Sequence, residues 1–413
     1  MRQSATAMTE YFIRRARGAV RAAALLVGVA ALTACASSPS SRVGASARTG
    51  GGGASAQPSA PIVNPNGPVI IALLAPTTAP SPGASQVAQD LTAAAQIALS
   101  EHAPANLTMK IYDTNGNAAD AAVAVGHAVR DGAALILGPL LGESTAAVAP
   151  VAAQAGLNVI SFSNDASVAG GNVWVLGQLP GDEMRRLFSY AGSQGVGSIA
   201  LLHPQDRYGQ AVASAAPEAG RSAGVRVRPI LGYQRSFEGI EGSSQANASE
   251  IRASGVDGVL ITDTGDALRS VAAFLGYHDV SPRQYRYLGL SRWDDPANAS
   301  ESVLQGGWYV SADPERHAAF ADKFAAMLNR RPSPLATIGY DAVVAAADIV
   351  RAAAAGGPPA FSAAAITASA HDGATGVFRL TRDGLNRRSF AVMEITKDGP
   401  IKLDPAPTSA PGA

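Results

Sequence analysis

From Val69 onward the chain alternates short apolar runs with longer segments of helical spacing, and this alternation restricts the fold more than any other feature. Val69–Leu74 (VIIALL) is continuously apolar, which is typical of a strand covered on both faces. Residues 87–102 then repeat Ala, Leu and Ile at the intervals of a helix. Because strands joined through helices pair in parallel, the pattern predicts an α/β fold with helices on both faces of a parallel sheet.

The alternation occurs as two series, which predict two doubly wound lobes. The first series has expected strands at 69–74, 107–112, 134–136 and 158–162 and helices at 87–102, 118–130 and 144–155. The second has expected strands at 198–202, 225–231, 258–261 and 285–290 and helices at 208–223, near 248–253 and at 267–275. Two late helices, 314–328 and 338–354, precede a hairpin expected over 376–395 with Asp383-Gly384 at its turn.

These elements predict one two-lobe domain over residues 69–405, followed by a short tail at 406–413. Lobe 1 is expected over about 69–180 and lobe 2 over about 181–330, with the later elements acting as hinge crossovers. In open parallel sheets, ligands bind beyond the carboxyl ends of the strands. The cleft between the lobes is therefore the expected binding site.

The first 34 residues have the pattern of a bacterial export signal. Arginines between Arg14 and Arg21 precede an apolar stretch of 11 residues, 22–32, which is too short to span a bilayer core. Leu32-Thr33-Ala34-Cys35 then resembles the bacterial lipobox, and Cys35 is the only cysteine of the chain. We predict that residues 1–34 are a signal peptide and that Cys35 is lipidated. The alternative is an unpaired core cysteine in a long N-terminal helix.

Residues 35–68 after the signal are mainly Ser, Gly, Ala and Pro, which cannot bury enough apolar surface to fold. As a flexible tether this segment reaches about 30 Å. Ala36 stands where many Gram-negative bacteria use Asp to retain lipoproteins in the inner membrane. We therefore expect the protein on the periplasmic side of the envelope, held by a lipid anchor, with the outer membrane favoured.

Charge and motif content argue against nucleic-acid partners and against catalysis. Beyond residue 48 the chain has 25 basic and 31 acidic residues, without a basic stripe that could bind phosphates. The six histidines lack metal-ligand spacing, and neither 142–146 nor 289–293 completes a nucleophile elbow. No Gly-rich phosphate loop follows a strand. We predict no catalytic residue, no metal and no cofactor.

Five short phrases, in this order along the chain, resemble the type I periplasmic solute-binding family, the leucine-binding-protein-like group. They are Gly138-Pro139 with Ser144, Val159-Ile160-Ser161, Asp206-Arg207-Tyr208-Gly209, Gly339-Tyr340-Asp341-Ala342-Val343 and Ala374-Thr375-Gly376-Val377-Phe378. The resemblance covers about Val69–Lys402 and implies the periplasmic binding protein type I fold. It further implies an amino-acid-like ligand between the lobes, a role in amino-acid uptake or sensing, and an ABC permease as partner.

Three other phrases resemble the outer-membrane lipoproteins that activate penicillin-binding-protein peptidoglycan synthases. These phrases are Gly138-Pro139-Leu140-Leu141, Leu179-Pro180-Gly181-Asp182-Glu183 and Ser291-Arg292-Trp293. This second resemblance implies activation of a synthase by protein contact. Those activators carry an additional N-terminal helical-repeat domain, and this chain has a short tether in its place.

The first lobe offers candidate ligand-binding residues in the loops after its strands. Ser144 and Thr145 open the helix that follows Gly138-Pro139, where hydroxyl and free backbone N–H groups can hold a carboxylate. The solute-binding resemblance implies that Ser144 contacts the ligand, and an N-cap without a ligand explains it equally. Ser161, Ser163 and Asn164 end the fourth expected strand, as ligand contacts or as ordinary turn residues.

The second lobe offers three further candidates. The resemblance implies that Tyr208 closes over the ligand, whereas a Tyr that opens a helix also serves for packing. Asp263 follows the apolar run 258–261 and is available for a ligand ammonium, or is a solvated loop acid. Trp293 is the tryptophan expected to face a ligand, because polar residues surround it; the alternative is a core position.

Overall fold

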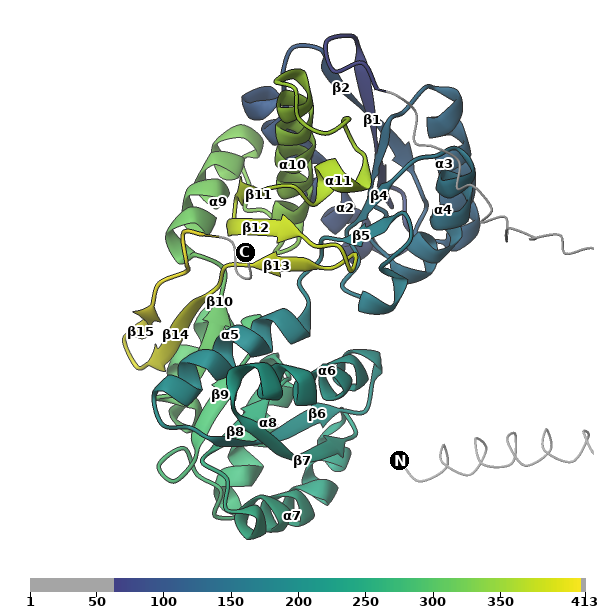
Figure 1. Ribbon diagram of the computed structural model, residues 1–413. Coiled ribbons are helices and arrows are strands. Elements are labelled where there is room, and N and C mark those ends of the chain that lie inside the picture. Colours follow the sequence, from purple (N-terminus) through teal and green to yellow (C-terminus); the bar gives the residue numbers. More distant parts are fainter. Residues whose placement is uncertain (1–62, 410–413) are drawn as a thin grey trace, which may run out of the picture. The chain divides into compact units, whose positions relative to one another are not determined.

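The computed structural model describes residues 63–409, which contain two α/β lobes built around separate sheets (Figure 1). The first sheet has the order β2-β1-β3-β4-β5, and all of its pairs are parallel. Its elements are β1 (Val69–Ala75), α2 (Pro82–His102), β2 (Leu107–Asp113), α3 (Ala118–Arg130), β3 (Leu135–Leu137), α4 (Gly142–Gln154), β4 (Val159–Ser161), a 3-10 turn at Ala166–Val168 and β5 (Val173–Val175). The expected parallel sheet is confirmed.

Side chains of β1 alternate between two apolar cores, one on each face of the first sheet. Ile71 and Leu73 are fully buried in a core shared with α2 and with α10 (Ala336–Ala354). Ala72 and Leu74 are buried in the other core, against α3 and α4. Since successive side chains of a strand point to opposite faces, the continuous apolar run VIIALL follows from burial on both sides.

The second sheet has the order β15-β14-β10-β9-β8-β6-β7, parallel from β10 to β7 and antiparallel at β14 and β15. Its lobe consists of α5 (Pro180–Ser193), β6 (Ser198–Pro204), α6 (Arg207–Ala223), β7 (Arg226–Tyr233), α7 (Phe237–Ser254), β8 (Gly258–Ile261), α8 (Gly265–Tyr277), β9 (Arg286–Gly289), 3-10 turns at Ser291–Trp293, Pro296–Ser300 and Ser302–Leu304, β10 (Trp308–Ser311), β14 (Ala391–Thr396) and β15 (Gly399–Asp404). β7 ends the sheet, with Arg226 and Arg228 exposed along it.

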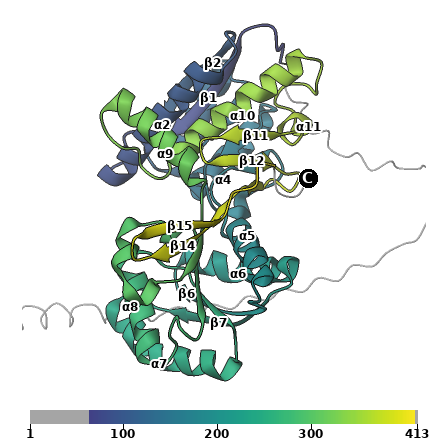
Figure 2. The same ribbon diagram turned by 90° about the vertical axis from the view of Figure 1, so that its left-hand side faces the viewer.

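The late elements return to the first lobe. They are α9 (Pro314–Leu328), α10, α11 (Ala363–Ile366) and a small antiparallel sheet of β11 (Ala370–Gly373), β12 (Gly376–Leu380) and β13 (Asn386–Arg388). The views in Figure 1 and Figure 2 show α9, α10 and this small sheet together with β1 and β2. Phe320 and Phe324 of α9 lie in the same core as β1, which fixes α9 to this lobe.

The expected single hairpin over 376–395 is wrong in its second half. β12 and β13 do form an antiparallel hairpin around Asp383-Gly384. The chain then leaves the first lobe, and β14 pairs with β10 of the second sheet. Phe390 and Val392 are buried in the core of the second lobe, and this burial favours the pairing of β14 with the second sheet.

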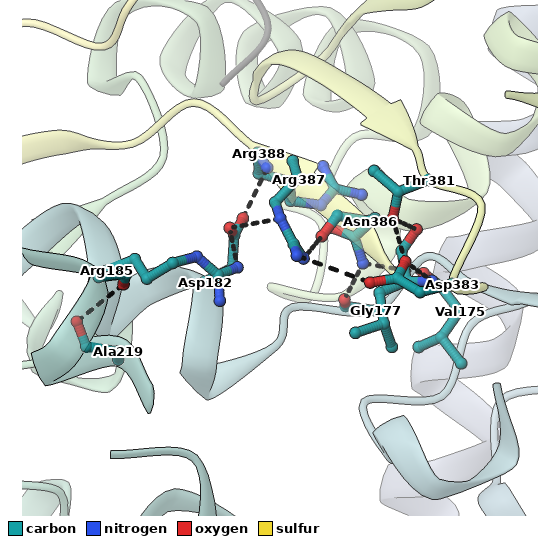
Figure 3. A network of polar contacts seen from close by, with 12 residues as sticks. Val175, Gly177, Asp182, Arg185, Ala219, Thr381, Asp383, Asn386, Arg387 and Arg388 are labelled. Atoms are coloured by element: carbon teal, nitrogen blue, oxygen red, sulfur yellow. Dashed lines mark hydrogen bonds and ion pairs between the residues drawn. The ribbon is translucent and has the colours of Figure 1, made fainter. Parts of the chain in front are cut away.

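Polar contacts join two of the three chain segments that connect the lobes (Figure 3). The end of β5 and the segment that follows it present backbone carbonyls to residues that precede β14. Asn386 Nδ2 donates to the carbonyls of Val175 at 2.9 Å and Gly177 at 2.8 Å. The backbone N–H of Arg388 donates to Asp182 Oδ2 at 2.6 Å. These contacts tie the first crossover to the last one.

A buried ion pair lies beside the same crossovers. Arg388 Nη1 donates to Asp341 Oδ2 of α10 at 2.7 Å, and Arg388 Nη2 donates to the carbonyl of Leu176 at 2.9 Å. Asp341 is fully buried and also accepts the backbone N–H of Ala374 at 2.8 Å. Because buried charges require partners, this pair fixes α10, β13 and the first crossover in one arrangement.

Candidate functional site

A cavity of about 410 Å³ lies where loops after strands of both sheets meet. The first lobe contributes the loops that follow β3 and β4, and the second contributes the start of α5 and of α6. The lining residues are Leu140, Leu141, Gly142, Glu143, Ser163, Asn164, Asp165, Pro180, Arg207, Tyr208 and Ala211. This is the edge at which open parallel sheets bind ligands, because the carboxyl ends of their strands gather there.

A glycine at the end of β3 allows the loop after this strand to lie against β1. Gly138 has φ +87°, and a Cβ at this position would come within 2.3 Å of the Leu74 carbonyl oxygen. A side chain here would therefore clash with the backbone of the neighbouring strand. Gly138 thus helps to position the loop that leads into α4.

The first turn of α4 borders the cavity, although Ser144 is not one of the lining residues. Leu141, the residue before the helix, provides no side-chain cap, and Gly142 and Glu143 line the cavity. The first N–H groups of a helix have no partner within it and carry a partial positive charge. Ser144 Oγ is buried and has no hydrogen-bond partner among the described residues. This turn can hold an anionic group such as a carboxylate.

The other candidate hydroxyls of the first lobe are bonded to one another. Thr145 Oγ1 and Ser161 Oγ are 2.7 Å apart, and both side chains are buried. Ser161 Oγ accepts the N–H of Ser163 at 3.2 Å, and Ser163 Oγ accepts the N–H of Asp165 at 3.0 Å. Ser163 and the exposed Asn164 line the cavity, whereas Thr145 and Ser161 hold the loop beneath it.

Arg207 brings a positive charge from α6 to the acidic side of the cavity. Its Nη2 lies 2.5 Å from Asp165 Oδ2, and its Nη1 lies 3.7 Å from Glu143 Oε1. Hydrogen bonds from Ser167, together with Arg207, hold the pKa of Asp165 below its ordinary value. The cavity therefore combines a guanidinium, two carboxylates and the N–H groups of α4.

Tyr208 lines the cavity and also interacts with a second polar cluster, which contains Arg292 and Glu183. Arg292 Cζ lies 4.2 Å from the centre of the Tyr208 ring, a cation–π distance. Burial raises the pKa of the Tyr208 hydroxyl above its ordinary value, and the charge of Glu183 adds to this effect. Arg292 Nη1 is buried and unpartnered among the described residues.

Glu183 of α5 is buried behind Tyr208 and was not among the residues expected from the sequence. It accepts two hydrogen bonds from Ser291, one from the N–H at 2.9 Å and one from the hydroxyl at 3.0 Å. Burial raises the pKa of Glu183 to about 7, despite these bonds. This carboxyl group therefore changes protonation near neutral pH.

Asp263 and Trp293 do not line the cavity. Asp263 accepts hydrogen bonds from the Tyr233 hydroxyl at 2.8 Å and from Arg235 Nε at 3.1 Å. Trp293 is buried against Gly289, where a Cβ would overlap the indole, and its Nε1 donates to the Ile261 carbonyl at 2.9 Å. Both side chains have structural partners in this arrangement, and ligand contact by either of them stays a prediction.

Two features are absent from residues 63–409. No group of three or more His, Cys, Asp and Glu side chains within this range is arranged to hold a metal ion. No helix within it combines the length and apolar character needed to cross a membrane. Cys35, the predicted lipidation site, lies outside the described residues.

Residues 68–400 match a family model described as periplasmic binding protein. A search of curated proteins gave no match. Among solved structures, a periplasmic ligand-binding protein of a branched-chain amino acid ABC transporter from Burkholderia xenovorans has a TM-score of 0.63 at 16% identity, covering 82% of this chain and 94% of that one.

Two further solved structures contain a bound ligand. An ABC transporter substrate-binding protein from Desulfitobacterium hafniense in complex with Leu has a TM-score of 0.58 at 17% identity, covering 81% of this chain and 99% of that one. A solute-binding protein from R. palustris in complex with benzoate has a TM-score of 0.56 at 16% identity, covering 83% and 98%. At these identities the likeness concerns the fold.

Proposed function

The chain belongs to the periplasmic binding protein family, and from this premise we propose that it binds a small, polar, amino-acid-like ligand between its two lobes, for amino-acid uptake or sensing. Family membership indicates a periplasmic location. The proposed partner is an ABC permease, since the similar structures are named as ABC transporter components. The proposal includes no catalytic step.

One observation carries this proposal: the cavity is lined from both lobes by groups of both charges. The start of α4 offers N–H groups near the Ser144 hydroxyl, which has no hydrogen-bond partner in residues 63–409, and these groups suit a carboxylate. Glu143 and Asp165 offer carboxylates that suit an ammonium group. The volume of about 410 Å³ falls in the range of about 300–1,000 Å³ that is usual for small-molecule sites.

We expect replacement of Ser144 or Tyr208 to weaken ligand binding without unfolding the protein. Ser144→Ala removes a buried hydroxyl beside the α4 N–H groups, and Tyr208→Phe removes the hydroxyl of a ring that lines the cavity. A lost hydrogen bond to a charged ligand group is worth about 1.5–3 kcal/mol, or about tenfold or more in affinity. Calorimetry with the purified full chain, against a panel including leucine, isoleucine and benzoate, measures this loss.

Matched controls separate binding from stability. Ser214→Ala removes an exposed hydroxyl of α6, and Tyr277→Phe changes a ring that is 81% exposed. Both should bind a verified ligand as the parent does, and all four variants should keep similar unfolding midpoints. A Ser144→Ala or Tyr208→Phe variant with parental affinity would show that this residue has a structural role only. A panel without any binder, together with faster synthesis by a purified peptidoglycan synthase, would favour the activator alternative.

We also propose that Cys35 carries the lipid that anchors the protein, with the outer membrane favoured. Its support is the lipobox Leu32-Thr33-Ala34-Cys35 behind a basic and apolar signal. Cys35→Ala should move the protein from the membrane fraction to the soluble fraction and abolish lipid labelling, because no second cysteine can accept the lipid. Retention in the membrane with undiminished labelling would contradict the anchor. Ser38→Ala in the tether serves as the control.

A further inference from the structure

A depression on the first lobe shares no lining residue with the cavity described above. Its volume is about 1000 Å³, and it is open to solvent. Its lining residues come mainly from α11, the residues that follow α11, and the turn that joins β12 to β13. Figure 1 labels α11, β12 and β13. The lining residues are Trp174, Ala363, Ala364, Thr367, Ala368, Arg379, Leu380, Thr381, Arg382 and Asp383.

Two arginines in this depression have no ion-pair partner among the described residues. Neither Arg379 nor Arg382 forms an ion pair with any acid in residues 63–409, although most arginines of these lobes do. Arg379 Nε is buried and without a hydrogen-bond partner in that same range. A buried donor without a partner costs about 1–3 kcal/mol, so such groups in folded proteins require an explanation.

The single acid of the depression is already engaged elsewhere. Asp383 accepts the N–H of Leu385 at 3.1 Å and a hydrogen bond from the Thr381 hydroxyl. Its other oxygen lies 3.7 Å from Arg387 Nη2, and Figure 3 shows these residues together at the hairpin turn. Asp383 therefore does not neutralise Arg379 or Arg382, and the depression keeps an excess of positive charge.

Apart from Thr367 and Thr381, the remainder of the lining is apolar. Ala363, Ala364 and Ala368 present small methyl groups from α11 and the residues that follow it. Trp174 of β5 forms part of the wall, and its Nε1 donates to the Thr381 carbonyl at 3.1 Å. This bond fixes the hairpin turn to the first sheet. The depression thus has a wall held in place by the Trp174–Thr381 hydrogen bond, with guanidinium groups beside small apolar side chains.

We propose that this depression is a second binding site, for a small organic carboxylate whose apolar part contacts the alanine methyl groups. Guanidinium groups bind carboxylates through charge-assisted and often bidentate hydrogen bonds. A bound carboxylate provides an acceptor for Arg379, whose Nε is the donor without a hydrogen-bond partner in residues 63–409. The apolar body of the ligand covers Ala364 and its neighbours. The inference goes beyond the proposed function, because none of its residues lines the cavity between the lobes.

N-acetyl-alanine is a suitable probe, because it joins a carboxylate to a small apolar body and lacks an ammonium group. Titration of the full chain by calorimetry should show saturable binding. Removing one charged partner costs about tenfold in affinity, so Arg379→Gln and Arg382→Gln should each weaken binding by about this factor and the double variant should abolish it. Ala364→Phe, which fills the depression from an exposed helix position, should block binding without a change of charge.

Three controls make the result decisive. N-acetyl-alaninamide, which has no carboxylate, should not bind. Arg226→Gln removes an exposed charge from β7 of the other lobe and should leave the affinity unchanged. Ser144→Ala should also leave it unchanged, which separates this site from the proposed function. The proposal would be overturned if the amide bound as tightly as N-acetyl-alanine. Parental affinity in both the arginine double variant and Ala364→Phe would also overturn it, as would tighter binding of inorganic phosphate.

Discussion

Replacing Arg388 with methionine is expected to lower the free energy of unfolding by about 3–5 kcal/mol, because it leaves a buried carboxylate without its partner. Asp341 is fully buried, Arg388 is 5% exposed, and their charged atoms are 2.7 Å apart. The same guanidinium also satisfies the carbonyl of Leu176. Methionine fills a similar volume and makes none of these bonds. Urea unfolding of the full chain at neutral pH measures the loss.

Two variants test whether the loss comes from an unpaired buried charge. Asp341→Leu combined with Arg388→Met removes both charges and should recover part of the stability, since apolar replacement of a whole buried pair is often tolerated. Arg316→Met breaks an exposed pair with Asp372 and should cost less than about 1 kcal/mol. An Arg388→Met loss as small as that of Arg316→Met would contradict the buried-pair argument.

The stability of the protein is expected to fall by about 3 kcal/mol from acidic to alkaline pH through Glu183 alone. Burial raises the pKa of this carboxyl from an ordinary value of 4.5 to about 7, with Asp182 adding to the effect and Arg292 opposing it. Between these pH values the folded state retains a proton that the unfolded state has released. The contribution of Glu183 to the free energy of unfolding is therefore complete below pH 4.5 and is lost as pH rises through about 7.

Glu183→Gln tests this dependence, because an amide of the same shape does not titrate. Urea unfolding at several pH values between 4.5 and 8 should give a difference between parent and variant that grows as pH rises. Glu241→Gln, at an exposed position of α7, should follow the parent at every pH. A parent-minus-variant difference that is constant across this range would show that Glu183 does not titrate in it.

Much of the fold could be predicted because it depends on local patterns. VIIALL predicts β1, since burial of both sheet faces requires apolar residues at every position.

The extent of α7 was predicted poorly. It runs from Phe237 to Ser254, far longer than the expected segment near 248–253. Two glycines and four serines weaken its helical signal. Packing of Ile240 and Ile251 into the core outweighs the low helix propensity of these residues.

Elements whose neighbours are distant in sequence were harder to predict. β10 (Trp308–Ser311) has only four residues, and its identity as a strand depends on pairing with β9 and β14. β14 follows β13 after a gap of two residues, yet it belongs to the other sheet. Local alternation favours a hairpin over this whole stretch. The choice between the two sheets depends on which core accepts Phe390.

The candidate site likewise contains some residues that could be predicted from the sequence and others that could not. Ser163, Asn164 and Tyr208 could be placed at the cavity because residues after parallel strands gather at one edge. The partners of Arg207 could not, since Asp165 is 42 residues away and lies in the other lobe. Glu183 and Ser291 are 108 residues apart, so the buried position of that carboxyl has no sequence signal either.

The arginines on β7 also affect how copies of this protein behave at high concentration. β7 ends the seven-stranded sheet, and an exposed sheet edge is a template for adding a strand from another molecule. Arg226 and Arg228 would place like charges near one another in such a pairing, and Pro229 has no N–H to donate. These three residues therefore disfavour edge-to-edge pairing of two copies through β7.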